Sequence, residues 1–266
     1  MKSLTLVLSV IITALAWNLE AQVTQQRQLG EFTGIDQETF ADIYISPGDI
    51  TTVTVKADED VIDRLITKVE DGVLKISSKG NFRMVKVFEV HITMSRIDLI
   101  KNSGSGDIKC TGGLPGKDVE ININGSGDLD ADLQVINLEL KINGSGDVNL
   151  SGVKGDLQVI ASGSGDLFAD ELQLENCRVS MTGSGDSKLS GSSVQLTVTQ
   201  NGSGDLNARQ LKAVDADIRN TGSGDCSVQA VNKLSASLNG SGDLYYYGAP
   251  EKVSVVANGS GEAHKR

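Results

Sequence analysis

The chain has 266 residues, of which 35 are acidic and 24 are basic, so its formal net charge at pH 7 is −11. A surface this acidic repels phosphate, which argues against nucleic acid or an anionic membrane surface as a partner. Three cysteines, at positions 110, 177 and 226, have neither a disulfide nor a metal-binding spacing, and we expect them to be buried as small apolar residues.

Residues 1–21 have the pattern of a secretory signal peptide. Lys2 is followed by an apolar run from Leu4 to Trp17, and the small Ala21 stands at the expected cleavage position. The apolar run is too short for a membrane span, and the absence of a nearby cysteine argues against a lipid anchor. We therefore expect an exported protein that is not embedded in a membrane and that resides in the periplasm, at the outer-membrane surface or outside the cell.

Residues 22–100 lack the repeat described below but are rich in alternating apolar and polar residues, which is typical of strands. Asp71-Gly72 lies between two such runs and predicts a hairpin turn. The stretch from Asp58 to Ile66 is a candidate short helix, with Asp58 or Asp60 as its N-cap. We interpret 22–100 as an N-terminal β-rich cap with irregular first coils, and a separate small β domain is the alternative.

Residues 101–266 are organised around a four-residue motif, Gly-Ser-Gly-Asp, which recurs at intervals of 18 to 21 residues. A fixed period near twenty is typical of a solenoid, in which each repeat is buried by its neighbours. The nine copies begin at Gly104, Gly125, Gly144, Gly163, Gly183, Gly202, Gly222, Gly240 and Gly259, and only the last has Glu262 in place of Asp.

Apolar residues alternate with polar ones on both sides of each motif, as in Val119 and Ile121 before it and Leu129 and Ala131 after it. Each repeat is therefore predicted to carry two short strands joined across a glycine corner, and stacked repeats would form an all-β, right-handed parallel β-helix of about nine regular coils. The glycines are expected to supply positive φ angles at the corner, where Asp and the residue before the motif would bond local backbone groups.

The acids of the motif form a column that runs from Asp107 to Glu262. At a spacing of about 4.8 Å, neighbouring carboxylates repel by roughly 1 kcal/mol in water, so something must offset the repulsion. The favoured explanation is that each Asp accepts backbone N–H groups at its own corner; the alternative is Ca²⁺ bound between coils. Calcium-binding β-rolls differ, because they repeat every nine residues.

Tyr245, Tyr246 and Tyr247 stand out in a chain with ten aromatic residues. We expect Tyr246 to enter the interior column and help to close the C-terminal end. Tyr245 falls on an outward position, and Phe168 falls on the same outward column. The two rings are a candidate platform for stacking on a sugar.

No residues are assigned to a catalytic, cofactor or metal site. An active site needs a unique cluster of acids and bases, whereas the acids here are nearly the same in every repeat. His91 and His264 are the two histidines of the chain, and they lie far apart in the sequence. Catalysis is therefore not expected.

The segments Phe32-Thr33-Gly34-Ile35, Asp71 to Ile76 and above all Val119 to Leu129 resemble the bacterial family described as putative auto-transporter adhesin, head GIN domain (DUF2807). The resemblance extends from about residue 27 to the end. It implies a right-handed β-helix exported into the envelope of Gram-negative bacteria, and it brings no ligand or catalytic residues with it.

The sequence thus favours a non-enzymatic exported scaffold whose outward strand faces bind a glycan or a protein at the cell envelope, without a cofactor. A ladder of repeated side chains suits a repetitive polymer, because many weak contacts add up. The alternatives are a structural envelope protein without a dedicated ligand, a calcium-stabilised solenoid and an enzyme acting on polysaccharide.

Overall fold

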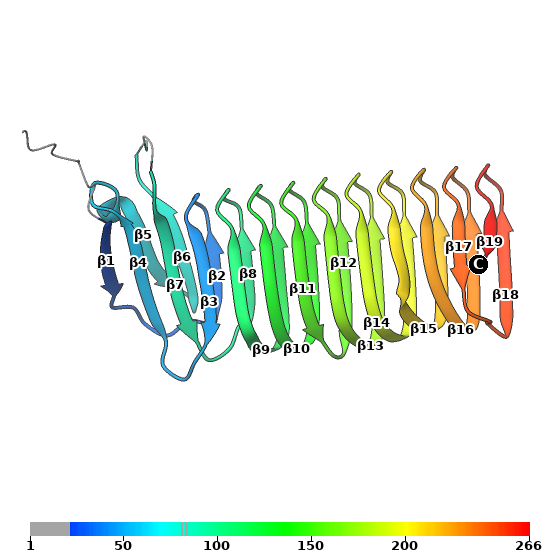
Figure 1. The fold of residues 1–266 in the computed structure, drawn as a ribbon, viewed down its shortest axis with the longest axis horizontal. Coiled ribbons are helices and arrows are strands. Elements are labelled where there is room, and N and C mark those ends of the chain that lie inside the picture. Colours follow the sequence, from blue (N-terminus) through cyan, green and yellow to red (C-terminus); the bar gives the residue numbers. More distant parts are fainter. Residues whose placement is uncertain (1–21, 81, 83–84) are drawn as a thin grey trace, which may run out of the picture.

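The computed structural model describes residues 22–80, 82 and 85–266, and the predicted signal peptide lies outside this part. The fold is an all-β solenoid of about nine turns (Figure 1), as the repeat predicts. Within the described part, no helix is long and apolar enough to cross a membrane.

Each regular coil starts just after a corner Asp and ends two residues before the next corner. In most coils one long strand runs through the bend opposite the corner, so the prediction of two short strands per repeat is wrong there. The unbroken coils are β9 (Ile108–Ile123), β10 (Leu129–Ile142), β13 (Leu167–Met181), β14 (Ser187–Gln200), β15 (Leu206–Asn220) and β16 (Cys226–Leu238). Two coils are divided, into β11 (Val148–Val153) with β12 (Asp156–Ala161) and into β17 (Leu244–Tyr247) with β18 (Lys252–Ala257), and β19 (Ala263–Lys265) ends the chain.

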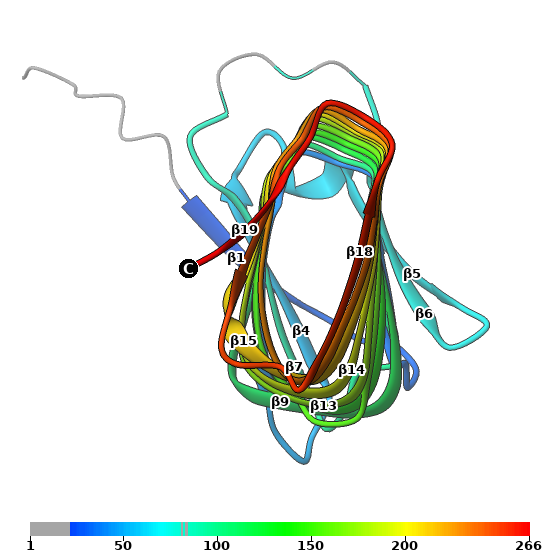
Figure 2. The ribbon, with the colours of Figure 1, turned by 90° about the vertical axis from the view of Figure 1, so that its right-hand side faces the viewer.

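Neighbouring coils pair in parallel, with like positions in register; Leu129 pairs with Val148, and Leu138 with Leu157. Viewed from the C-terminal end in Figure 2, the chain ascends along β18, crosses the corner and descends along β19 on the other side. It turns anticlockwise as it approaches the viewer, and the solenoid is right-handed as predicted.

The interior is filled by columns of apolar side chains. Leu138, Leu157 and Leu234 are at most 2% exposed, and Tyr246 packs against the same core at its C-terminal end, as predicted. Since burying a leucine contributes about 1.5 to 3 kcal/mol, each added coil is stabilised mainly by these columns. The cysteines are also confirmed as buried: the three thiols are free, and burial raises their pKa to about 12.

The lead-in segment continues the sheet of the coils. β3 (Asp42–Pro47) pairs in parallel with both β9 and β7 (Phe88–Met94), and β4 (Thr52–Asp58) and β1 (Gln22–Arg27) then extend the sheet antiparallel. On the other side, β2 (Gly34–Gln37) pairs in parallel with β8 (Leu99–Asn102) and with β6 (Val73–Ser78), which forms an antiparallel hairpin with β5 (Leu65–Glu70).

Two local predictions in the lead-in segment had different outcomes. The hairpin turn at Asp71-Gly72 is confirmed, with φ angles of 51° and 76°. The predicted helix with an Asp N-cap is wrong: the stretch forms only a 3-10 turn, η1 (Ile62–Arg64), without a side-chain cap. The Asp58 carboxylate instead accepts the backbone N–H of Lys86 at 2.7 Å.

The corner glycines are required by close approach and not by positive φ, so the predicted reason is wrong. None of the motif glycines has a positive φ. A Cβ on Gly125 would lie 1.8 Å from the carbonyl oxygen of Gly104, and one on Gly127 would lie 2.1 Å from that of Gly106. Stacked corners therefore touch backbone to backbone, which keeps successive coils in register and aligns their outward side chains.

Candidate binding face

A continuous ladder of carboxylates borders one face of the solenoid. Each Asp Oδ1 accepts the backbone N–H of the corner acid in the next coil; Asp147 does so from Asp166, and Asp166 from Asp186, both at 2.8 Å. The predicted bonds to the N–H at the same corner are therefore wrong, although the acceptor role is right. We call this the Asp ladder, and it consists of Asp42, Asp107, Asp128, Asp147, Asp166, Asp186, Asp205, Asp225, Asp243 and Glu262.

The N–H donations offset the repulsion between stacked carboxylates, because hydrogen bonds to an ionised acceptor are stronger than neutral ones. At the end of the ladder, the backbone N–H of Glu262 is the main cause of a lowered pKa for Asp243. Within the described part of the chain, no group of three or more His, Cys, Asp or Glu side chains is arranged to hold a metal ion. What the structure shows for the ladder is one carboxylate oxygen of each Asp bonded to the backbone of the next coil.

The strand segments that follow the corner acids present one flat face to solvent, which we call the Asp-side face. Its main outward column consists of the residues two positions after each member of the ladder. In order along the axis these are Tyr44, Lys109, Asp130, Asn149, Phe168, Lys188, Asn207, Ser227, Tyr245 and His264. The prediction that Phe168 and Tyr245 share an outward column is therefore confirmed.

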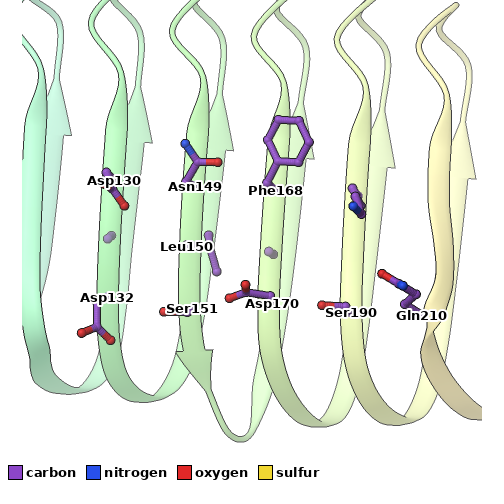
Figure 3. Close-up of a pocket in the computed structure, with 12 residues that line it drawn as sticks. Asp130, Asp132, Asn149, Leu150, Ser151, Phe168, Asp170, Ser190 and Gln210 are labelled. Atoms are coloured by element: carbon purple, nitrogen blue, oxygen red, sulfur yellow. The ribbon is translucent and has the colours of Figure 1, made fainter.

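Phe168 lies in the middle of this column and is 44% exposed. Figure 3 shows it in line with Asp130 and Asn149, with its ring turned outward from the sheet. A second row of polar side chains, including Asp170 and Ser190, runs beside it in the same view. Together these residues line a shallow groove of about 420 Å³, with an aromatic surface surrounded by hydrogen-bonding groups.

The two tyrosines nearest the ends of the column each stack on a histidine. At the N-terminal end, the Tyr44 ring stacks on His91 with centroids 4.9 Å apart, and His91 Nε2 lies 2.9 Å from Glu89 Oε2. At the C-terminal end, the Tyr245 ring stacks on His264 at 5.3 Å. The histidines therefore lie at opposite ends of the face and cannot share a catalytic site.

Tyr245 is held by two further contacts. Its hydroxyl donates to Asp243 Oδ2 at 3.2 Å, and the Arg266 guanidinium lies 5.0 Å from the ring centroid. Burial and the neighbouring Asp243 carboxylate raise the pKa of the Tyr245 phenol, which stays protonated at neutral pH. The ring is thus positioned at the end of the groove.

Tyr44 and His91 were not identified from the sequence as part of this face. They lie in the irregular lead-in segment, where the motif is absent. One signal was available: Asp42-Ile43 with Ile45 matches the pattern Asp107-Ile108 with Cys110, which places Tyr44 at the same outward position as Lys109. That pattern would have identified Asp42 as the first member of the ladder.

Hollows on the Asp-side face run into one another along the axis. A hollow of about 270 Å³ includes Tyr44 and Asn149, the central groove includes Asn149 and Phe168, and one of about 360 Å³ includes Phe168 and Tyr245. Shared lining residues make them one continuous groove.

The opposite face has a hollow of similar size but a different character. It measures about 450 Å³ and is lined by charged residues such as Glu139 and Arg178. Beside it, Lys141 pairs with Glu120 at 3.4 Å and with Glu139 at 2.9 Å. The strand segments that precede the corners between residues 99 and 257, all within the described part, contain no aromatic residue. Aromatic character therefore distinguishes the Asp-side face.

Comparisons with solved structures show the same fold. A putative adhesin from Parabacteroides distasonis is 21% identical with a TM-score of 0.70, over 92% of this chain and 97% of that one. A putative lipid binding protein from the same species is 25% identical with a TM-score of 0.64, over 92% and 96%. A putative adhesin from Bacteroides fragilis is 21% identical with a TM-score of 0.53, over 93% and 98%.

No curated protein matches the chain. The model of the family described as putative auto-transporter adhesin, head GIN domain (DUF2807) matches residues 31–188 and 176–250, which together cover most of the chain. The resemblance read from the sequence is thereby confirmed, and the chain belongs to this family of adhesin-like β-solenoids.

Proposed function

We propose that the protein is a non-enzymatic, exported, adhesin-like scaffold that binds a glycan at the bacterial cell envelope through its Asp-side face. The observation that carries the proposal is the column of outward rings, Tyr44, Phe168 and Tyr245. The described strand segments of the opposite face between residues 99 and 257 contain no such ring. The predicted signal peptide and the membership of an adhesin-like family support export.

The chemistry of the face suits a sugar. The face of an aromatic ring is electron-rich, so it attracts the weakly positive C–H groups of a pyranose ring. The rows on either side carry amide, hydroxyl and carboxylate groups, such as Asn149, Ser190 and Asp170, that can bond sugar hydroxyls. Ring surfaces for stacking and polar groups for orientation are the two components that a carbohydrate site needs.

A non-enzymatic role is supported by the distribution of charged groups. The corner acids repeat along the whole axis with the same backbone partner, and the histidines lie at opposite ends. The relatives are named for adhesion or lipid binding. The lipid-binding name belongs to that relative, and the interior of this chain is filled by its own side chains.

A glycan array probed with the mature protein, residues 22–266, tests the proposal. We expect the wild type to bind a set of glycans, and Phe168→Ala to lose at least about three-quarters of the signal, because a stacked ring contributes about 1 kcal/mol or more. Val194→Ala is the matched control, since Val194 is an exposed apolar residue (57%) in the bend opposite the corners. Binding kept by a Phe168→Ala/Tyr245→Ala double variant would exclude this face, and a wild type that binds no glycan would favour a purely structural role.

A further inference from the structure

The outward column of the Asp-side face repeats with a period of four coils. From Tyr44 onward, the column residues of four successive coils are an aromatic ring, a lysine, an Asp or Asn, and a small polar residue. The same order then starts again at Phe168, and a third ring, Tyr245, follows four coils later, with His264 as its neighbour. The two complete units are Tyr44, Lys109, Asp130 and Asn149, followed by Phe168, Lys188, Asn207 and Ser227.

The period has a definite length. Neighbouring strands lie about 4.8 Å apart, so rings four coils apart are separated by about 19 Å, and Tyr44 and Tyr245 by about 38 Å. Because the corner glycines hold the coils backbone to backbone, this spacing is built into a rigid frame. The column thus offers two units of similar residue types in a row, each beginning with a ring and a lysine, and the continuous groove described above connects them.

The histidines support the same geometry. His91 stacks on Tyr44 from the side away from Lys109, and His264 stacks on Tyr245 from the side away from Ser227. The two stacking histidines therefore lie on the sides of Tyr44 and Tyr245 that face away from Phe168.

The negative charge along the groove restricts which ligands can bind there. The Asp ladder borders the groove along its whole length, and members such as Asp128 and Asp166 also line the hollows. The ladder acids outnumber the two lysines of the column: Lys109 is paired with Asp130 at 3.3 Å, and Lys188 lines a hollow that also contains Asp166, Asp186, Asp205 and Asp225. A uronate or phosphate group placed beside one of these carboxylates would be repelled by about 1 kcal/mol in water, and the repulsion would recur at every coil.

We infer that the ligand is a linear, uncharged polysaccharide that lies along the solenoid axis and repeats its contacts every four coils. The inference rests on the proposed glycan-binding function and adds the orientation, the charge class and the minimum length of the ligand. A chain long enough to reach a second ring binds through two linked contacts, so its affinity rises by much more than the added contact area implies.

The test is the dependence of affinity on chain length. Size-fractionated oligosaccharides of neutral mannan, xylan and dextran are titrated by calorimetry against the wild type. We expect affinity to rise at least about tenfold when the oligosaccharide becomes long enough to span about 19 Å, and again near 38 Å. Alginate and polygalacturonate, which carry a carboxylate on each sugar, are expected to bind at least about tenfold more weakly than the neutral polymers.

Two variants show which rings cause the steps in affinity. Phe168→Ala leaves rings only at the two ends, so the step near 19 Å should vanish while binding of the longest chains remains. Tyr245→Ala keeps the pair formed by Tyr44 and Phe168, so the step near 19 Å should remain and the one near 38 Å should vanish. Val194→Ala should behave as the wild type, and circular dichroism checks that every variant is folded.

The outcomes separate this inference from the proposed function. Affinity that rises smoothly with length, without a step lost in Phe168→Ala, would show that the ligand does not lie along the column. Polyanions that bind as tightly as neutral polymers would overturn the charge argument. If no saccharide of any length or charge binds the wild type, the glycan-binding function itself fails.

Discussion

Replacement of a corner glycine by alanine tests why the motif contains glycine. At Gly144 an added Cβ would lie 1.9 Å from the carbonyl oxygen of Gly125, and contacts under 3.0 Å are essentially never seen for real Cβ atoms. The two corners must therefore separate by at least about 1.1 Å, the difference between these two distances. That movement would disturb the bond from Ser145 N–H to Gly125 O (3.1 Å) and the bond from Gly144 N–H to Ile123 O (3.2 Å).

The expected cost follows from these contacts. Overpacking a tight site costs about 1 to 3 kcal/mol, and each weakened hydrogen bond adds about 0.5 to 1.5 kcal/mol. We therefore predict that Gly144→Ala lowers the free energy of unfolding by about 2 to 6 kcal/mol. The effect should appear as a lower urea midpoint in far-UV circular dichroism. Gly30→Ala is the control, because nothing lies within 4 Å of the added Cβ.

A second substitution separates close approach from backbone conformation. Asn tolerates positive φ better than Ala does, so a glycine needed for its φ angle is replaced more easily by Asn. If the close contact with the Gly125 carbonyl is the reason for the glycine, Gly144→Asn should lower the free energy of unfolding at least as much as Gly144→Ala. Our explanation would be refuted if Gly144→Ala were as stable as Gly30→Ala, or if Gly144→Asn were clearly more stable than Gly144→Ala.

Three further predictions concern ionisable groups. Asp147→Ala removes the acceptor of the Asp166 N–H and should lower the free energy of unfolding in urea by about 1 to 2 kcal/mol. Asp147→Asn keeps an acceptor oxygen and should lower it by less. Equal losses for the two variants would contradict the hydrogen bonding of the Asp ladder. Hydrogen bonds from Lys68 and Lys75 lower the pKa of the partly exposed Glu70 to about 2, so their stabilising contribution is present above the unfolded value of 4.5 and is lost as pH falls through 2. An ordinary Glu70 pKa in an NMR titration would show that the pairs do not persist. Thiols with a pKa near 12 should resist alkylation until the chain unfolds, so labelling of the native protein would contradict the buried positions of Cys110, Cys177 and Cys226.

The architecture was predictable because the repeat determines it. A period near twenty, with apolar residues such as Leu138 and Leu140 alternating before each motif, allows one arrangement that buries every apolar face. The same alternation placed Phe168 and Tyr245 on one outward column, and the parallel register confirms it.

The roles of the corner residues could not be predicted from one repeat considered alone. Both the contact of Gly125 with Gly104 and the bond from Asp166 N–H to Asp147 join one coil to the next. A single turn suggests that such residues shape their own corner. For this reason the sequence wrongly predicted positive φ angles for the corner glycines and a bond from each Asp to an N–H of its own corner. Tyr44 was missed for a related reason, because its partners β7 and β9 lie far away in the sequence.

The most direct test of the binding face is hydroxyl-radical footprinting, read out by mass spectrometry, with and without a saturating neutral polysaccharide chosen from the mannan, xylan and dextran series. We predict that the ligand protects Tyr44, Phe168 and Tyr245 together. Phe40, a ring that is 37% exposed outside the outward column, should be oxidised equally in both samples. Protection that leaves the three rings of the column unchanged would contradict the assignment of the Asp-side face as the binding surface.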